Sequence, residues 1–165
     1  MVNLESGERP RSPIYLLAEN VRSLFNVGAL FRTADGVNAR GICLSGFTGR
    51  PPRKEITRVA LGAEEAVPWM YRSDPAEAVR EFVGTGVQMV ALEQTAESCD
   101  YRDFPYKFPV GLVVGHEVEG VSPGTLYVCD GSVHLPMHGT KTSLNVSVAA
   151  AVGLYHLASL LENQI

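Results

Sequence analysis

Short apolar segments alternate with helix-like segments along most of this chain, and that alternation restricts the fold more than any other feature. Six segments have the length and composition of buried strands: 14–18, 41–44, 67–71, 88–92, 110–114 and 133–135. Residues 110–114 are wholly apolar, which is typical of a strand buried on both faces. The pattern therefore predicts an α/β fold in which helices cover both faces of a mostly parallel sheet.

The segments between these strands carry helix signals. From residue 26 to 35, Val27, Leu30, Phe31 and Ala34 are spaced for one apolar face, with Asn26 as a candidate cap and Gly36 at the end. Further helices are expected at 55–61, at 75–83 behind a capping Asp74, and from about 143 to 161.

The length and composition are those of an ordinary soluble globular domain. A chain of 165 residues with 45% apolar side chains is expected to form a single domain over residues 1–165. It contains no apolar run of 18 residues, and the polar leader 1–13 lacks the apolar core of a signal peptide, so we expect a cytoplasmic protein without a membrane span. Cys43, Cys99 and Cys129 lie far apart, which predicts buried, reduced thiols.

Charge is distributed unevenly along the sequence. The net charge is −4, yet residues 1–58 carry nine basic and five acidic side chains, whereas residues 59–165 carry five basic and thirteen acidic ones. An anionic partner at one face is compatible with this asymmetry, and so is a solvated surface with no partner.

Ligands of parallel sheets bind beyond the carboxyl ends of the strands, and three polar or glycine-rich segments are expected there. In residues 20–34, Arg22 and Arg32 carry guanidinium groups that can bind phosphate oxygens, although a surface ion pair is the alternative for Arg32.

In residues 115–121, Gly115 would let a ligand approach the backbone, Gly120 would permit a tight turn, and Glu117 would accept hydrogen bonds or merely stabilise the loop. Gly120 occupies the position where a metalloprotease HExxH helix needs its second histidine.

A third polar segment, residues 139–147, leads into the C-terminal helix. It lacks the spacing of a phosphate-binding GxxxxGK[ST] loop. Ser143 either caps the helix or faces a ligand. Asn145 is expected just inside the helix, where asparagine is unfavourable unless it has a hydrogen-bond partner.

The order and combination of these three motifs identify a family more specifically than any single motif does. NxGxxxRTA at 26–34, an apolar strand running into GxExxG at 113–120, and LPM…SLNVSVAAA at 135–151 together resemble the SpoU/TrmH branch of the SPOUT RNA methyltransferases. The resemblance implies a homodimer that transfers a methyl group from S-adenosylmethionine (SAM) to a ribose 2′-hydroxyl of tRNA or rRNA, without a metal. It also implies a deep trefoil knot over residues 110–161.

The resemblance also assigns roles to residues of this chain. It implies a catalytic set of Asn26, Arg32, Glu117, Ser143 and Asn145. It implies a SAM site formed by Leu92, Gly115, Leu135, Met137, Ser143 and Leu144. The expected RNA contacts are Arg22, Arg32, Arg50, Arg53, Lys54 and Arg58, which belong to the basic N-terminal third.

The role of Arg32 has two interpretations. Guanidinium groups have a pKa above about 12, so deprotonating one near neutral pH is costly. Arg32 therefore either loses its proton with help from an RNA phosphate, or it positions the phosphate and the hydroxyl; we favour positioning.

The alternative functions for the whole chain are a non-catalytic RNA-binding or SAM-sensing module on the same fold, a base-methylating relative and a flavodoxin-like nucleotide binder.

Overall fold

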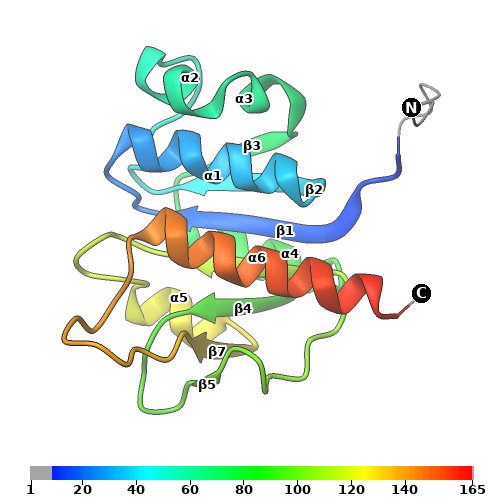
Figure 1. Cartoon of the computed structure of the whole chain (residues 1–165), viewed down its shortest axis with the longest axis vertical. Coiled ribbons are helices and arrows are strands. Elements are labelled where there is room, and N and C mark those ends of the chain that lie inside the picture. The colour runs from blue at the N-terminus through cyan, green and yellow to red at the C-terminus, as the bar shows by residue number, and fades with distance from the viewer. Residues whose placement is uncertain (1–8, 165) are drawn as a thin grey trace.

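A single sheet organises the chain. The computed structural model describes residues 9–164, and in it seven strands pair in the order β3-β2-β1-β6-β4-β7-β5, every pairing being parallel (Figure 1). The strands are β1 (Ser12–Glu19), β2 (Ala39–Ser45), β3 (Trp69–Arg72), β4 (Gln88–Leu92), β5 (Cys99–Asp100), β6 (Val110–Val114) and β7 (Gly131–His134). The predicted parallel sheet is confirmed.

Helices cover both faces of this sheet, as predicted. They are α1 (Leu24–Gly36), α2 (Lys54–Ala60), α3 (Ala63–Ala66), α4 (Pro75–Gly84), α5 (Pro123–Val128) and α6 (Val146–Glu162). Helices α1 and α6 lie side by side on one face, α4 and α5 lie on the other, and α2 and α3 pack against α1 (Figure 1). The core therefore has two apolar layers, one on each side of the sheet.

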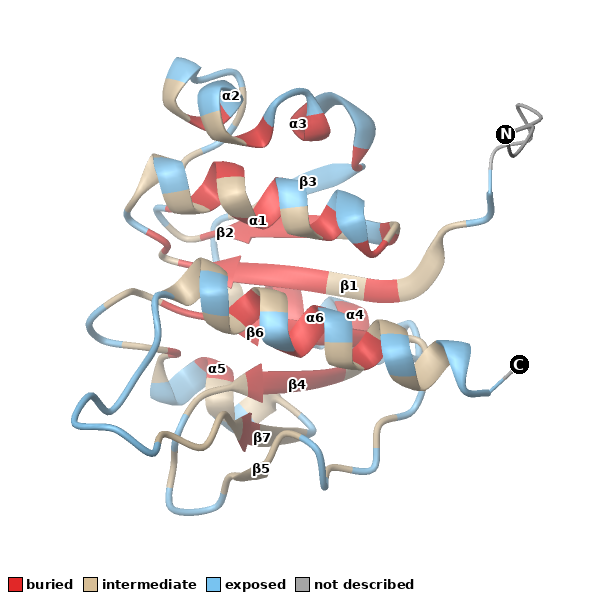
Figure 2. Cartoon of the chain, viewed as in Figure 1, coloured by how far each residue is buried: buried red, intermediate tan, exposed pale blue. Residues whose placement is uncertain are grey.

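The central strand β6 explains why the 110–114 segment is wholly apolar. It pairs with β1 on one side and with β4 on the other, so that Leu112 lies between Leu16 and Val90. All residues of β6 are buried, and Figure 2 shows the buried colour along the neighbouring strands β1 and β4, whereas the outer strands β3 and β5 have no buried residue. Helices on both faces leave no position of this strand for a polar side chain.

Some elements differ from the sequence predictions. The short α3, β5 and α5 were not predicted, because four, two and six residues are too few for a periodic pattern. Strands expected at 67–71 and 133–135 lie at Trp69–Arg72 and Gly131–His134. Strand β1 begins at Ser12, inside the expected leader, and residues 1–8 of that leader lie outside the described residues. The threading of residues 110–161 into a knot stays a prediction.

Two helix caps also differ. Ser23, not Asn26, caps α1, and its hydroxyl accepts from the backbone N–H of Asn26 at 3.3 Å. Asn145, not Ser143, caps α6, so Asn145 precedes the helix instead of standing inside it. Asp74 caps α4 as predicted.

The cysteines are reduced, and only Cys43 is fully buried, whereas Cys99 and Cys129 are half-buried. Burial raises the pKa of the Cys43 thiol to about 11 and that of Cys129 to about 12, which keeps both in the unreactive thiol form near neutral pH. In the part of the chain that the structure describes, no helix has the length and apolar character needed to cross a membrane.

Candidate active site

The three polar motifs meet at the carboxyl edge of the sheet. Glu117 follows β6, Asn26 lies in the first turn of α1, and Asn145 precedes α6. The Asn26 amide donates from Nδ2 to Glu117 Oε1 at 3.1 Å, and the Asn145 amide donates from Nδ2 to Asn26 Oδ1 at 3.3 Å. A continuous chain of side-chain hydrogen bonds therefore joins residues that come from all three motifs.

Glu117 anchors one end of this series of side-chain hydrogen bonds. Its carboxylate also accepts the backbone N–H groups of Arg22 and Ser23, both at 3.0 Å. Burial acts to raise the pKa of Glu117, but these backbone bonds and the Asn26 amide outweigh it, so the pKa lies below its usual range. Glu117 is therefore an anion that fixes the start of α1, and it is poorly suited to accept a proton.

Asn145 anchors the other end and acts in two ways. Its Oδ1 accepts from Ser147 N at 2.9 Å, from Ser147 Oγ at 2.6 Å and from Val148 N at 3.4 Å, which caps α6. Its Nδ2 remains free to donate to Asn26. One amide therefore caps the helix with its oxygen and joins the site with its nitrogen.

Gly115 and Gly120, in the loop 115–120, are required for different structural reasons. Gly120 adopts a φ of +71°, which confirms the predicted tight turn. Gly115 lies against the same loop, where a Cβ would come within 2.3 Å of the Gly120 carbonyl carbon. His116 and Gly120 close the loop through two backbone hydrogen bonds of 3.1 and 2.9 Å. The requirement for glycine at 115 thus arises from the loop's own backbone.

Two carboxylates that the sequence analysis missed hold the far end of this loop. Glu93 accepts the backbone N–H of Val121 at 2.9 Å. Glu19, only 2% exposed, accepts the Ser122 N–H at 3.1 Å and the Thr125 hydroxyl at 3.0 Å. Glu19 is the last residue of β1, and Glu93 directly follows β4. A glutamate at the end of an apolar strand was therefore the sequence signal that could have identified both.

A cavity of about 400 Å³ opens beside the hydrogen-bond chain. It is lined by the ends of β4 and β6, the 115–120 loop and the segment before α6. All the residues expected to bind SAM line it: Leu92, Gly115, Leu135, Met137, Ser143 and Leu144. Its lining also includes Glu93, Glu117 and Glu119 and, among the described residues, no lysine or arginine.

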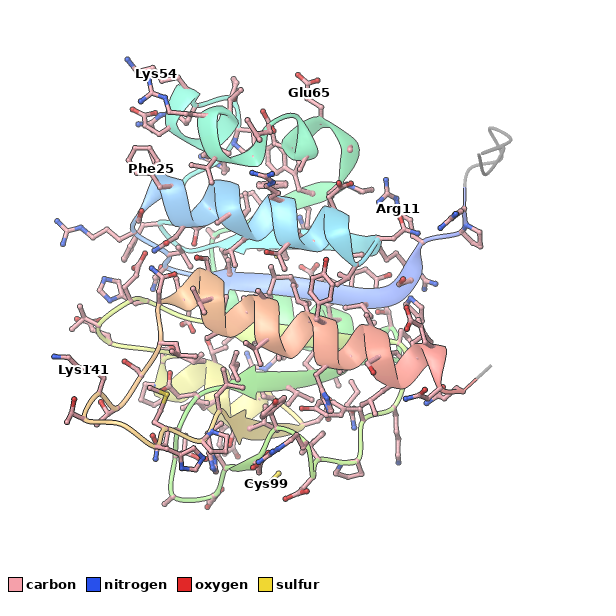
Figure 3. All side chains as sticks on the ribbon, viewed as in Figure 1. Arg11, Phe25, Lys54, Glu65, Cys99 and Lys141 are labelled. Carbon is pink, nitrogen blue, oxygen red and sulfur yellow. The ribbon has the colours of Figure 1, made fainter. Side chains whose placement is uncertain are left out.

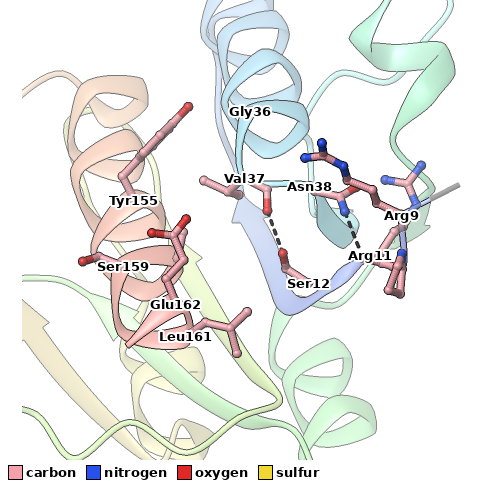
Figure 4. Close-up of a pocket in the computed structure, with 12 residues that line it drawn as sticks. Arg9, Arg11, Ser12, Gly36, Val37, Asn38, Tyr155, Ser159, Leu161 and Glu162 are labelled. Carbon is pink, nitrogen blue, oxygen red and sulfur yellow. Dashed lines mark hydrogen bonds between the residues drawn. The ribbon is translucent and has the colours of Figure 1, made fainter. Parts of the chain in front are cut away.

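A larger cavity of about 980 Å³ lies at the opposite edge of the sheet (Figure 4). Arg9, Arg11, Tyr155 and Glu162 are among its lining residues, and Ser12 there donates to the Val37 carbonyl at 2.9 Å. Because ligands of parallel sheets bind at the carboxyl edge, and because none of the three motifs reaches this cavity, we place the candidate site in the smaller one.

Other residues expected in the site are not joined to the hydrogen-bond chain. Ser143 lines the cavity and is exposed. Arg32 is exposed on α1, six residues and about 9 Å along the helix from Asn26, and makes no hydrogen bond or ion pair within the described residues. In this single chain, therefore, Arg32 does not reach the Glu117–Asn26–Asn145 group.

The other arginine and lysine residues expected to bind RNA are all exposed. The Arg50 guanidinium lies over the Tyr71 ring at 3.9 Å from its centre, and Arg53 lies 3.9 Å from Glu55. In Figure 3, Lys54 lies near Phe25, at the same edge as Lys141 and away from Arg11. Arg50, Arg53, Lys54 and Arg58 thus lie exposed in α2 and in the segment that leads into it from β2.

Comparison with known proteins identifies the family. The model of the SpoU rRNA Methylase family matches residues 13–155. A tRNA (guanosine(18)-2′-O)-methyltransferase of Aquifex aeolicus is 32% identical over 90% of this chain and 70% of its own length. A 23S rRNA (guanosine-2′-O-)-methyltransferase of Ralstonia nicotianae is 35% identical over 87% of this chain, which spans only 57% of that enzyme.

Solved structures agree with this result. The A. aeolicus TrmH/SpoU tRNA modifying enzyme matches with a TM-score of 0.85 at 32% identity, over 93% of this chain and 78% of that one. An AdoMet-bound rRNA methyltransferase from Sinorhizobium meliloti matches with a TM-score of 0.82 at 29% identity, over 92% of this chain and 58% of that one. The chain therefore belongs to the SpoU/TrmH family of RNA 2′-O-methyltransferases.

Proposed function

We propose that this chain transfers a methyl group from SAM to a ribose 2′-hydroxyl of tRNA or rRNA. The observation that carries the proposal is the Glu117–Asn26–Asn145 hydrogen-bond chain beside a cavity of ligand size. The names of its relatives support both RNA classes, since the A. aeolicus enzyme acts on tRNA and the R. nicotianae enzyme on 23S rRNA.

The smaller cavity fits SAM in size and in charge. Its volume of about 400 Å³ lies within the range of small-molecule sites. Apolar side chains such as Leu92, Leu135 and Leu144 suit a purine ring, and three carboxylates without a lysine or arginine suit a ligand with a positive sulfonium. When bound there, SAM would supply an electrophilic methyl group.

The chain's own residues would position the RNA and handle its charge. Glu117, with its lowered pKa and its three hydrogen bonds, fixes Asn26 and does not take the 2′-hydroxyl proton. Asn26 and Asn145 present amide groups that can orient the ribose. Arg32, a permanent cation, would hold the adjacent phosphate, which leaves the hydroxyl proton to another acceptor such as water.

A homodimer would bring Arg32 to a site that it does not reach within one chain. The outer faces of α1 and α6 expose Phe25, Val148, Val152 and Tyr155, and Arg32 lies two helical turns from Phe25 on the same face of α1. Exposed apolar side chains on two neighbouring helices are compatible with an interaction surface, and a twofold axis across it would place Arg32 against the partner.

The dimer is tested with two matched substitutions. Val152 on α6 is 36% exposed and Val83 on α4, on the opposite face of the sheet, is 38% exposed. We expect V152R to run as a monomer in analytical ultracentrifugation and V83R to remain a dimer. Wild-type protein that sediments as a monomer at micromolar concentration would reject the proposed dimer.

The proposed activity is tested by incubating the protein with methyl-labelled SAM and bulk tRNA or rRNA. We expect label in the RNA, and calorimetry should show SAM binding that is lost when Leu144, at the cavity wall, is replaced by arginine. SAM binding without transfer to either RNA would instead identify the chain as a non-catalytic module.

A further inference from the structure

One large aromatic side chain stands in solvent at the carboxyl edge of the sheet. Phe47 follows β2 and is 61% exposed. A single exposed apolar residue is ordinary on a protein surface and needs a second observation before it indicates a binding site. Phe47 belongs to a turn that is held on both sides.

Hydrogen bonds fix this turn residue by residue. The backbone N–H of Phe47 donates to Asn20 Oδ1 at 2.9 Å. On one side, Gly46 has a φ of +64°, and its carbonyl accepts the Tyr71 hydroxyl at 2.6 Å. On the other side, the buried Thr48 hydroxyl donates to the Ser45 carbonyl at 2.8 Å and accepts the Val21 N–H at 3.0 Å. The fold therefore presents the Phe47 ring on a rigid support.

The ring lies next to the cavity proposed for SAM. Phe47 and His116 meet edge to face, with ring centres 5.9 Å apart at an interplanar angle of 79°. His116 is itself a lining residue of that cavity. Its Nδ1 accepts the backbone N–H groups of Val118 and Glu119 at 3.0 and 3.1 Å, so its ring is held as firmly as the Phe47 backbone.

The surroundings of Phe47 favour a nucleic acid as the occupant. Arg50, three residues further along, lies over the Tyr71 ring, whose hydroxyl supports the Phe47 turn. Arg53 and Lys54 continue the exposed basic surface. Exposed cations beside an exposed aromatic ring are the combination with which proteins bind the phosphates and bases of single-stranded nucleic acids.

We infer that Phe47 is a stacking platform for one unpaired nucleobase of the RNA substrate, adjacent to the nucleotide that is methylated. This inference rests on the proposed function and adds to it a residue that selects unpaired RNA. Paired bases hide their faces within the helix, whereas an unstacked base offers its whole face to Phe47. Phe47 thus positions RNA without touching the reacting atoms.

The test compares F47A with F47Y, which retains the ring, and with Y127A as the matched control. Tyr127 is 88% exposed on α5, which packs with α4 on the face of the sheet opposite α1 and α6. Affinities for bulk tRNA and bulk rRNA are measured by filter binding in the absence of SAM, so that they do not depend on turnover. Calorimetry with SAM alone and thermal unfolding check that each variant is intact.

F47A should weaken binding of the preferred RNA about 10-fold, while F47Y and Y127A should bind within twofold of wild type. SAM affinity should stay unchanged in all three variants, and ultraviolet crosslinking followed by mass spectrometry should join RNA to Phe47. RNA affinity that is equal for wild type and F47A would overturn the inference. Wild-type protein that binds RNA but transfers no methyl group would overturn the proposed function alone.

Discussion

The side-chain amides of Asn26 and Asn145 share a hydrogen bond of 3.3 Å across 119 residues of sequence. This bond connects the start of α1 with the start of α6, and through Glu117 both helix starts are tied to the loop after β6. The geometry of the site therefore depends on side chains that also fix the ends of secondary-structure elements. Substitutions that separate these two roles test the account most sharply.

Replacing Asn145 by aspartate separates capping from the link to Asn26. A carboxylate still accepts from Ser147 and caps α6, but it cannot donate to Asn26 Oδ1. We expect N145D to unfold at nearly the same urea concentration as wild type and to lose most methyl transfer.

N145A should lose the cap as well, at about 1 kcal/mol of unfolding free energy. If N145A loses stability while both variants keep full specific activity, Asn145 is only a cap.

Glu117→Gln should destabilise the site, because an amide cannot accept three N–H bonds from Arg22, Ser23 and Asn26. Charge-assisted hydrogen bonds of this kind are worth about 2 kcal/mol each, less where solvent reaches them. Urea denaturation should show the loss. E119Q in the same loop, where the side chain is exposed, should unfold like wild type.

The effect of Glu117→Gln should also depend on pH. The pKa of Glu117 is lowered in the folded protein, so its contribution to stability is present above the unfolded value near 4.3 and is lost as the pH falls further. The difference in unfolding free energy between wild type and E117Q should be constant from pH 8 to 6 and shrink below about pH 4. A difference that grows at low pH would mean that Glu117 is not held as an anion.

Gly115→Ala should damage the loop that closes the cavity. The added methyl group would lie 2.3 to 2.4 Å from backbone atoms of Gly120 and Val121, which cannot move without opening the loop. Calorimetry should show weaker SAM binding and thermal unfolding a lower midpoint. Gly124 in α5 has no atom within 4 Å of the equivalent position, so G124A should be neutral in both measurements.

Arg32→Ala should preserve the fold and SAM binding and lose most methyl transfer. Arg32 is exposed and makes no hydrogen bond or ion pair within the described residues, so thermal unfolding should not change. Arg80, an exposed arginine of α4 that pairs with Glu77, provides the control, and R80A should transfer methyl groups at the wild-type rate. Near-normal turnover of R32A would remove Arg32 from the mechanism.

The sheet could be predicted because its signals are local. An apolar run such as 110–114, or Asp74 before α4, is a signal that lies within a few residues of sequence. Strand β5 has only Cys99–Asp100 and exists through its pairing with β7, so nothing within its own sequence marks it. Helix α5 did carry a local signal, since Ser122 caps it and Pro123 occupies its first turn.

The site could be predicted only in part, because its contacts are long-range. Family resemblance placed Asn26, Glu117 and Asn145 in one site, but the sequence offered no means of deciding that Asn145, not Ser143, caps α6. Glu19 was missed because a glutamate at the end of a strand is usually solvated, whereas here it lies buried and binds Ser122 and Thr125. Phe47 was missed because only the structure shows that its turn is rigid.

The most direct test of the account locates the methyl group in the RNA product. RNA labelled by this protein with methyl-labelled SAM is hydrolysed completely in alkali, and the fragments are separated by chromatography. Because ribose methylation removes the 2′-hydroxyl that alkali requires, the account predicts that the label elutes in uncleaved dinucleotides. Label that elutes wholly in mononucleotides would show base methylation and contradict the account.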